Sequence, residues 1–205
     1  MRTRSLTGGL MVGALLLLPL TGCLPGQGGA GDRAVRDITG LMPELRLTMT
    51  DHRGRPVTAE DFRGRVTLLY FGYTHCPDVC PTTLARVRRA LGRLEASGEV
   101  RVLFVTVDPA RDTRAALERY VGAFGAPFVG LRGTPAQLRD LARRYRVAYS
   151  RAEPGPDGAY PVTHSNAVFV FDRQGDARRV ALPGADADDL ARALRPLLEP
   201  PEART

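Results

Sequence analysis

The chain has 205 residues and a formal net charge of +7, and 43% of its residues are hydrophobic. This length and composition suit one globular domain with its own core. All 29 basic residues are arginine, and they are scattered among 22 acidic residues rather than clustered. We therefore expect no nucleic-acid partner, because such partners are bound by concentrated basic patches.

The first 22 residues have the pattern of a bacterial signal peptide. Arg2 and Arg4 precede a short apolar run, Gly8 to Leu20, which is shorter than the roughly 20 residues of a bilayer span. The segment Leu20-Thr21-Gly22-Cys23 resembles the lipobox of bacterial lipoproteins, in which cleavage leaves the cysteine as the lipidated N-terminus. An uncleaved anchor helix is the alternative.

Lipid attachment at Cys23 places the folded part outside the cytoplasm, in the periplasm or on the outer face of the cytoplasmic membrane. Disulfides persist in such compartments. Residues 23–40 are rich in glycine and proline and predict a flexible tether to the membrane. Residues 41–199 then form the folded domain, and residues 200–205 are a tail.

The domain begins with β-structure and continues with alternating strands and helices. Residues 44–50 alternate in polarity and predict a strand, and a turn leads to a second short strand at 56–58. Apolar runs predict buried strands, and helical spacing or capping residues predict helices. These segments are strands at 66–71, 100–107, 167–171 and 177–182, and helices at 81–96, from Asp112 or Thr113 through Phe124, at 134–144 and at 186–198.

This order of elements predicts a thioredoxin-like α/β sandwich with a central mixed β-sheet flanked by helices. In such open sheets, sites lie at the carboxyl ends of the parallel strands. The segment Cys76-Pro-Asp-Val-Cys80 falls where the first central strand gives way to its helix. Its position is therefore an argument for function.

Cys76 and Cys80 are four residues apart, a spacing that brings two side chains onto one face of a helix. Their axial separation of about 6 Å is compatible with a disulfide. The pair is therefore a metal site when reduced and a Cys76–Cys80 disulfide when oxidised. A purely structural disulfide is the alternative, but so small a loop would contribute only about 2 kcal/mol. A zinc finger lacks its second ligand pair.

His164 precedes an apolar strand, and in this fold that loop faces the loop of the cysteine pair. Two thiolates and an imidazole form a soft ligand set that favours copper over hard cations.

His75 is next to Cys76, but consecutive side chains diverge, so we interpret it as a neighbour of the site. Asp108, at the carboxyl end of the second buried strand, is placed to contact the site as a supporting carboxylate. A turn-forming role for Asp108 is the alternative.

Three motifs carry a family resemblance. The run from Tyr70 to Leu84 (YFGYTHCPDVCPTTL) resembles the signature of the Sco/SenC proteins, also called PrrC proteins in some members, which are thioredoxin-like, copper-binding assembly factors of cytochrome c oxidase. The run from Val105 to Thr113 (VTVDPARDT) matches their second motif, and His164-Ser165 matches the third. The resemblance spans about residues 41–199. It implies copper ligation by Cys76, Cys80 and His164, with Asp108 as an outer-sphere acid.

The resemblance implies a copper metallochaperone that delivers Cu(I) or Cu(II) to the CuA centre of cytochrome c oxidase subunit II, with a periplasmic copper donor upstream. A lipid anchor would replace the transmembrane anchor that is common in the family. Two alternatives stay open. One is a thiol–disulfide oxidoreductase that reduces the CuA-site cysteines of the acceptor through mixed disulfides, and the other is a redox or copper sensor.

Overall fold

The computed structural model describes residues 34–156 and 160–199. The predicted signal segment, Cys23, most of the predicted tether and the tail lie outside these residues. Within the described ranges, a mixed eight-stranded sheet has the order β1-β10-β9-β4-β5-β6-β2-β3. Its strands are β1 (Val35–Asp37), β2 (Thr48–Asp51), β3 (Pro56–Thr58), β4 (Val66–Gly72), β5 (Val100–Thr106), β6 (Phe128–Arg132), β9 (Val168–Phe171) and β10 (Ala177–Ala181).

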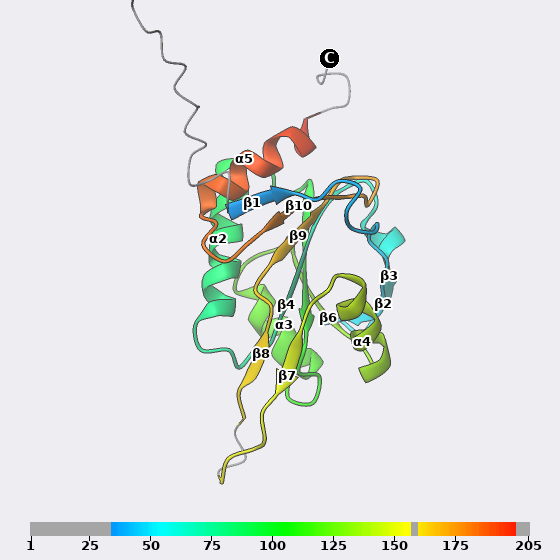
Figure 1. Cartoon of the computed structure of the whole chain (residues 1–205), viewed down its shortest axis with the longest axis vertical. Helices are drawn as coiled ribbons and strands as arrows, with labels where there is room; N and C mark the ends of the chain where they lie inside the picture. The colour runs from blue at the N-terminus through cyan, green and yellow to red at the C-terminus, as the bar shows by residue number, and fades with distance from the viewer. Residues whose placement is uncertain (1–33, 157–159, 200–205) are drawn as a thin grey trace, which may run out of the picture.

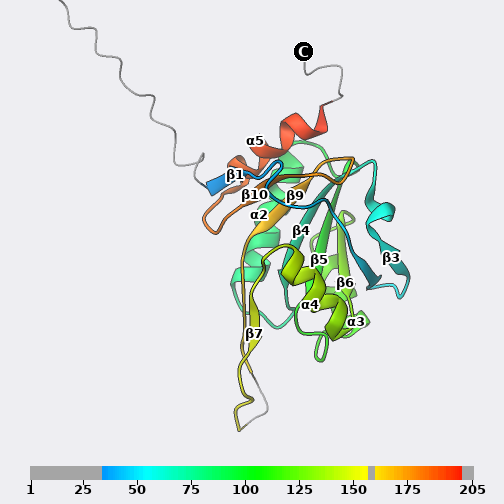
Figure 2. The same cartoon turned by 45° about the vertical axis from the view of Figure 1, so that its right-hand side comes forward.

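The three central strands β4, β5 and β6 are parallel, and β9 lies antiparallel to β4 on its other side. The helices are α2 (Val79–Arg93), α3 (Arg114–Gly122), α4 (Pro135–Arg144) and α5 (Ala187–Leu198), with a short 3₁₀ turn, η1 (Ala59–Phe62). Helices α2, α3 and α5 cover one face of the sheet, and α4 covers the other (Figures 1 and 2). This arrangement confirms the predicted thioredoxin-like sandwich.

The core is centred on β4, in which all seven residues are buried. A strand covered on both faces needs a continuous apolar run rather than an alternating one, and the sequence VTLLYFG supplies it. Leu68, Leu69 and Phe71 are fully buried, and the residues that pair with them on β5 and β9 are buried as well. The buried sheet fixes where β4 ends, and the residues that follow β4 carry the cysteines.

Capping residues set the helix starts as the sequence predicts. The Thr134 side chain accepts a hydrogen bond from the Gln137 N–H in a capping box, and Asp186 caps α5 in the same way. At α3 the cap is Thr113, whose hydroxyl accepts from the Ala116 N–H, and not Asp112. The Asp112 carboxylate is therefore not the cap of α3 and has other partners.

Four features differ from the sequence prediction. Val35–Asp37 forms strand β1 on β10 and Ile38 is buried, so residues 35–38 belong to the fold and not to the predicted tether. Strand β2 begins only at Thr48, although Leu45 and Leu47 are buried. The predictions also lacked β6 and a separate two-stranded sheet, β7 (Tyr149–Arg151) and β8 (Val162–His164). This β7–β8 hairpin projects beyond the carboxyl ends of the central strands (Figure 1).

No helix in the described part of the chain is long and apolar enough to cross a membrane.

Gly72, the last residue of β4, leaves space that Cys80 and Phe104 need. A Cβ at Gly72 would lie 2.6 Å from Phe104 Cε2 and 3.1 Å from Cys80 Sγ. We expect Gly72→Ala to destabilise the reduced protein by about 1–3 kcal/mol, the usual cost of overpacking a core. Urea unfolding followed by circular dichroism measures this.

Gly92→Ala is the matched control, because Gly92 lies on α2 with open space around it. Alanine at an exposed helical position stabilises by up to about 1 kcal/mol relative to glycine. Equal unfolding free energies for the two variants would contradict the close packing at Gly72.

Candidate metal centre

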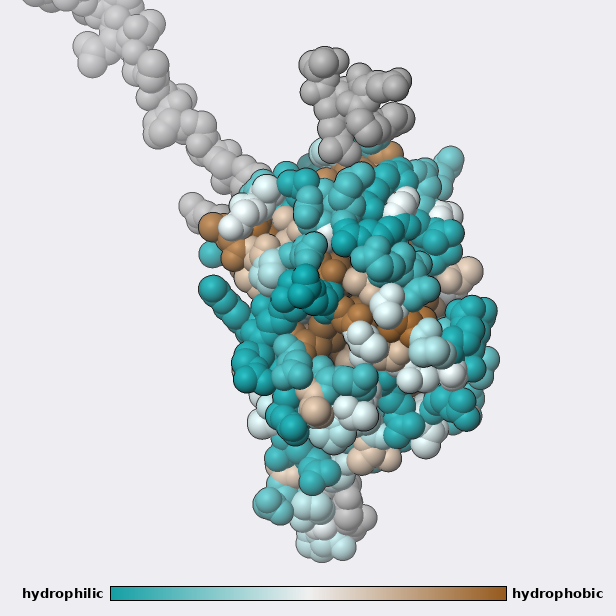
Figure 3. Space-filling model, turned by 90° about the vertical axis from the view of Figure 1, so that its right-hand side faces the viewer, coloured by the Kyte–Doolittle hydropathy of each residue, from teal (hydrophilic) through white to brown (hydrophobic). Residues whose placement is uncertain are grey.

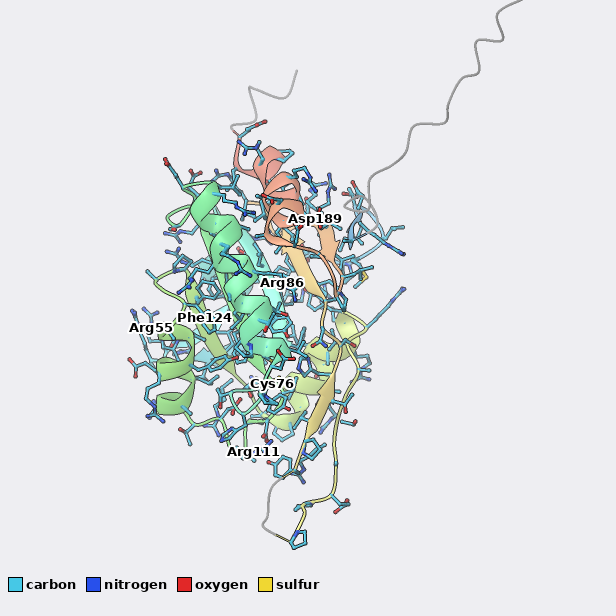
Figure 4. All side chains as sticks on the ribbon, turned by 90° about the vertical axis from the view of Figure 1, so that its left-hand side faces the viewer. Arg55, Cys76, Arg86, Arg111, Phe124 and Asp189 are labelled. Atoms are coloured by element: carbon cyan, nitrogen blue, oxygen red, sulfur yellow. The ribbon has the colours of Figure 1, made fainter. Side chains whose placement is uncertain are left out.

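The two cysteines lie on either side of the start of α2. Cys80 is the second residue of the helix, and Cys76 lies in the loop between β4 and Asp78, the residue just before the helix. The pair therefore lies where it was predicted, at the point where the first central strand gives way to its helix. The two thiols are close, because the Cys80 backbone N–H points at the Cys76 Sγ at 3.4 Å. Figure 4 shows Cys76 at one end of α2, with Arg111 beyond it.

His164 is the last residue of β8 and reaches the same point from the hairpin. Its Nε2 is 3.3 Å from the Cys80 Sγ, across 84 residues of sequence. Its Nδ1 is 3.1 Å from the backbone carbonyl of Ser165. Because a carbonyl only accepts, Nδ1 carries the proton and Nε2 presents a free lone pair to Cys80. This is the tautomer that a metal-ligating histidine requires.

The donor atoms of Cys76, Cys80 and His164 all lie within 4.8 Å of one another. Cys80 is buried, and Cys76 and His164 are half-buried. Two sulfurs and one neutral imidazole nitrogen suit a soft, thiophilic ion such as copper. The donor set therefore fits the metal that the sequence predicts, and Cys76 gives the cluster its opening to solvent.

The two thiols differ in acidity. Burial raises the pKa of Cys76, but N–H groups of Cys80 and Asp78 at the start of the helix donate to its sulfur and leave the pKa lower than that of a free thiol. Burial raises the pKa of Cys80 to about 12. Cys76 is thus the more acidic thiol and the better nucleophile of the pair, and Cys80 keeps its proton until a metal or a disulfide replaces it.

Two tyrosines frame the imidazole. The ring centroid of His164 is 6.0 Å from that of Tyr70 and 5.9 Å from that of Tyr73, both edge-on. Burial lowers the pKa of His164, so the ring is neutral near pH 7. No role for these two rings was predicted from the sequence. Their closeness to the cysteines in YFGYTHC was the available signal, but only the fold shows that His164 fits between them.

The remaining candidates lie beside the cluster. The His75 Nδ1 contacts the Thr74 hydroxyl and Asp112, and His75 is outside the group of metal-compatible residues found in the described part of the chain. The Asp108 carboxylate accepts from the Tyr160 hydroxyl at 2.9 Å and pairs with Arg111. None of its hydrogen bonds within the described residues reaches Cys76, Cys80 or His164.

A hollow with an apolar floor lies on the face that carries β2 and α4 (Figure 3). It encloses about 310 Å³ and is lined by Arg46, Leu47, Thr48, Met49, Gln137, Asp140, Leu141 and Arg144. Its lining contains neither cysteine nor histidine. The candidate metal ligands therefore lie near the carboxyl ends of β4 and β5, away from this hollow.

Comparison with known proteins agrees with this geometry. The SCO1/SenC family model matches residues 44–199. The bovine protein named "Protein SCO2 homolog, mitochondrial" is 44% identical over 132 residues, which are 63% of this chain and 50% of the bovine protein. A protein of Stutzerimonas stutzeri is 34% identical over 195 residues, covering 91% of this chain and 94% of its own.

Among solved structures, ScoI of Bradyrhizobium japonicum with copper bound superposes with a TM-score of 0.69. It is 33% identical, and the match covers 76% of this chain and 99% of that one. The chain spans about half the length of the mammalian relatives it matches.

The difference in thiol acidity predicts selective alkylation. In the reduced protein we expect iodoacetamide at pH 7 to label Cys76 and to leave Cys80 unlabelled, because only Cys76 is both accessible and acidic. The rate at Cys76 should reach half its maximum at a lower pH than for a free cysteine. Peptide mass spectrometry assigns each label, and Cys76→Ser is the control. Equal labelling of both cysteines would contradict the prediction that the Cys76 thiol is more acidic than the Cys80 thiol.

Proposed function

Because this chain belongs to the SCO1/SenC family, we propose that it is a copper metallochaperone in which Cys76, Cys80 and His164 bind the ion. The single observation that carries the proposal is the clustering of these three soft donors within 4.8 Å. The copper-bound ScoI of Bradyrhizobium japonicum supports it. Copper is the cargo here, so the site must both hold the ion and give it up.

The half-buried position of Cys76 supports transfer rather than storage. An incoming thiolate from an acceptor can approach copper from that side, while Cys80 and His164 hold the ion from within. Copper must also displace the proton of Cys80, whose pKa is raised to about 12. Since a proton and copper compete for this sulfur, the apparent copper affinity should rise as the pH rises.

The acceptor that we propose is the CuA centre of cytochrome c oxidase subunit II, which is also built from soft ligands. A periplasmic copper donor would load the site. These assignments follow from the family resemblance of the three motifs.

A second function, reduction of a partner's disulfide by the same pair, is favoured by one observation. The more exposed Cys76 is the acidic thiol and the buried Cys80 the protonated one. That is the division between attacking and resolving cysteines in thiol–disulfide exchange. Such exchange needs both cysteines and does not need His164.

We further propose that the mature protein is held at the outer face of a membrane through lipid on Cys23. The domain organisation follows from this proposal, with signal peptide 1–22, a tether and the folded domain. The lipobox-like run Leu20 to Cys23 supports it. One acyl chain binds a membrane only marginally, so we expect more than one chain.

Copper binding by the reduced protein distinguishes the two functions. With one equivalent of Cu(II), the wild type should show a thiolate-to-copper charge-transfer band and a matching EPR signal. Cys76→Ser, Cys80→Ser and His164→Ala should lose or alter both, and His75→Ala is the matched histidine control. Weak and equal binding by the wild type and His164→Ala, with disulfide exchange retained, would instead favour the reductase.

Anchoring is tested by expressing the chain with Cys23→Ala in a bacterial host. The wild type should be found in the membrane fraction with a mass increase for its acyl chains, and the variant should lack that mass. A wild type without any acyl mass would contradict lipid attachment.

A further inference from the structure

The turn between β5 and α3 holds two buried carboxylates. Asp108 is 3% exposed and Asp112 is fully buried. A buried carboxylate is costly unless charged or polar partners surround it. The partners of each aspartate therefore show which part of the molecule it holds.

Asp112 holds the loop that carries Cys76. Its Oδ2 accepts from the Thr74 backbone N–H at 3.0 Å, and its Oδ1 accepts from the Thr74 hydroxyl at 2.6 Å. The Thr106 hydroxyl at the end of β5 also donates to Oδ2, at 2.6 Å. Thr74 is two residues before Cys76, so this carboxylate joins the cysteine loop to the end of the neighbouring strand.

Asp108 holds the β7–β8 hairpin instead. The Tyr160 hydroxyl donates to its Oδ1 at 2.9 Å, and Arg111 pairs with its Oδ2. The Arg111 guanidinium also stacks on the Tyr160 ring, 3.6 Å from the centroid. Tyr160 lies two residues before β8 begins and four residues before His164. The contact therefore ties the strand that ends in His164 to the same turn.

We propose that the turn after β5 sets the distance between His164 and the cysteine pair. Asp112 positions the Cys76 loop through Thr74, and Asp108 positions His164 through Tyr160. Both aspartates act through other residues and are positioning residues, not ligands. The copper part of this inference rests on the proposed function. The geometric part concerns the metal-free protein and stands apart from it.

Two conservative variants test the Asp108 contact and the Asp112 contact separately. Replacing either aspartate removes several hydrogen bonds from a buried group and risks unfolding. Tyr160→Phe removes only the hydroxyl that reaches Asp108 and keeps the ring under Arg111. Thr74→Val removes only the hydroxyl that reaches Asp112. Tyr149→Phe is the matched control, because this tyrosine lies on the same hairpin and its hydroxyl makes no hydrogen bond found in the described part of the chain.

The test is a double-mutant cycle with His164→Ala, measured as Cu(I) affinity by competition with a chromophoric chelator. The full chain in detergent is used, with Cys23→Ser throughout so that Cys76 and Cys80 are the only thiols. Losing a partner that orients a ligand typically weakens metal binding by about 10–100-fold. We expect about tenfold weaker binding for Tyr160→Phe and no further loss when His164 is already alanine.

Thr74→Val should weaken binding in both backgrounds, because it acts through the cysteine loop. Tyr149→Phe should change nothing. A Tyr160→Phe loss of the same size with and without His164 would overturn the inference, because the hydroxyl would then stabilise the fold in general. An unchanged affinity for Tyr160→Phe would overturn it as well.

Hydrogen–deuterium exchange on the reduced, metal-free protein supplies a readout that does not involve copper. Tyr160→Phe should speed amide exchange in the β7–β8 hairpin, and Thr74→Val should speed it in the loop before Cys76. Unchanged exchange in both variants would overturn the inference. If the wild type fails to bind copper, the proposed function is contradicted. The hydrogen–deuterium exchange result then tests by itself whether Asp108 and Asp112 position the hairpin and the cysteine loop.

Discussion

The contact between the Cys80 Sγ and the His164 Nε2, at 3.3 Å, is the interaction on which the rest of the site depends. It joins the start of a helix to the end of a hairpin, and neither partner is charged at neutral pH. Burial keeps the thiol protonated and the imidazole neutral, so the pair is stable without a metal. Only Cys76 departs from this pattern, because it is half-buried and acidic.

Close packing around the two side chains makes that contact possible. The absent side chain of Gly72 admits Cys80 against β4, and edge-on contacts with Tyr70 and Tyr73 hold the imidazole. On the other side, one short turn carries both Asp108, which contacts Tyr160 before β8, and Asp112, which contacts Thr74 in the cysteine loop. A metal-binding protein of this kind has its ligands oriented before the ion arrives, so little ordering remains to oppose binding.

The sequence was informative where a local rule acts. The continuous apolar run of β4 and the capping residues Thr134 and Asp186 predict their elements correctly, because burial on two faces and helix termini leave local signals. The motif CPDVC and the later histidine led to the three donors, and the order of elements led to the thioredoxin-like fold. The proximity of His164 to the cysteines followed from that fold, not from the residues around His164.

Long-range partners left no comparable signal. Strand β8 is three residues long and follows a loop rich in proline and glycine, so its pairing with β7 could not be predicted locally. Asp112 looked like a helix cap because it lies beside Thr113, and only the position of Thr74 across the turn shows its actual partner. Asp108 was expected to face the cluster, whereas its carboxylate bonds to Tyr160, 52 residues away.

The position of β9 has a consequence for the order in which the site is assembled. His164 lies four residues before the start of β9, which pairs antiparallel with β4. The histidine therefore reaches Cys80 only when the C-terminal part of the chain has closed onto β4 and α2. Contacts between residues so far apart in sequence form late and slowly in folding. A newly synthesised chain therefore presents a dithiol first. The complete three-donor cluster forms only in the finished fold.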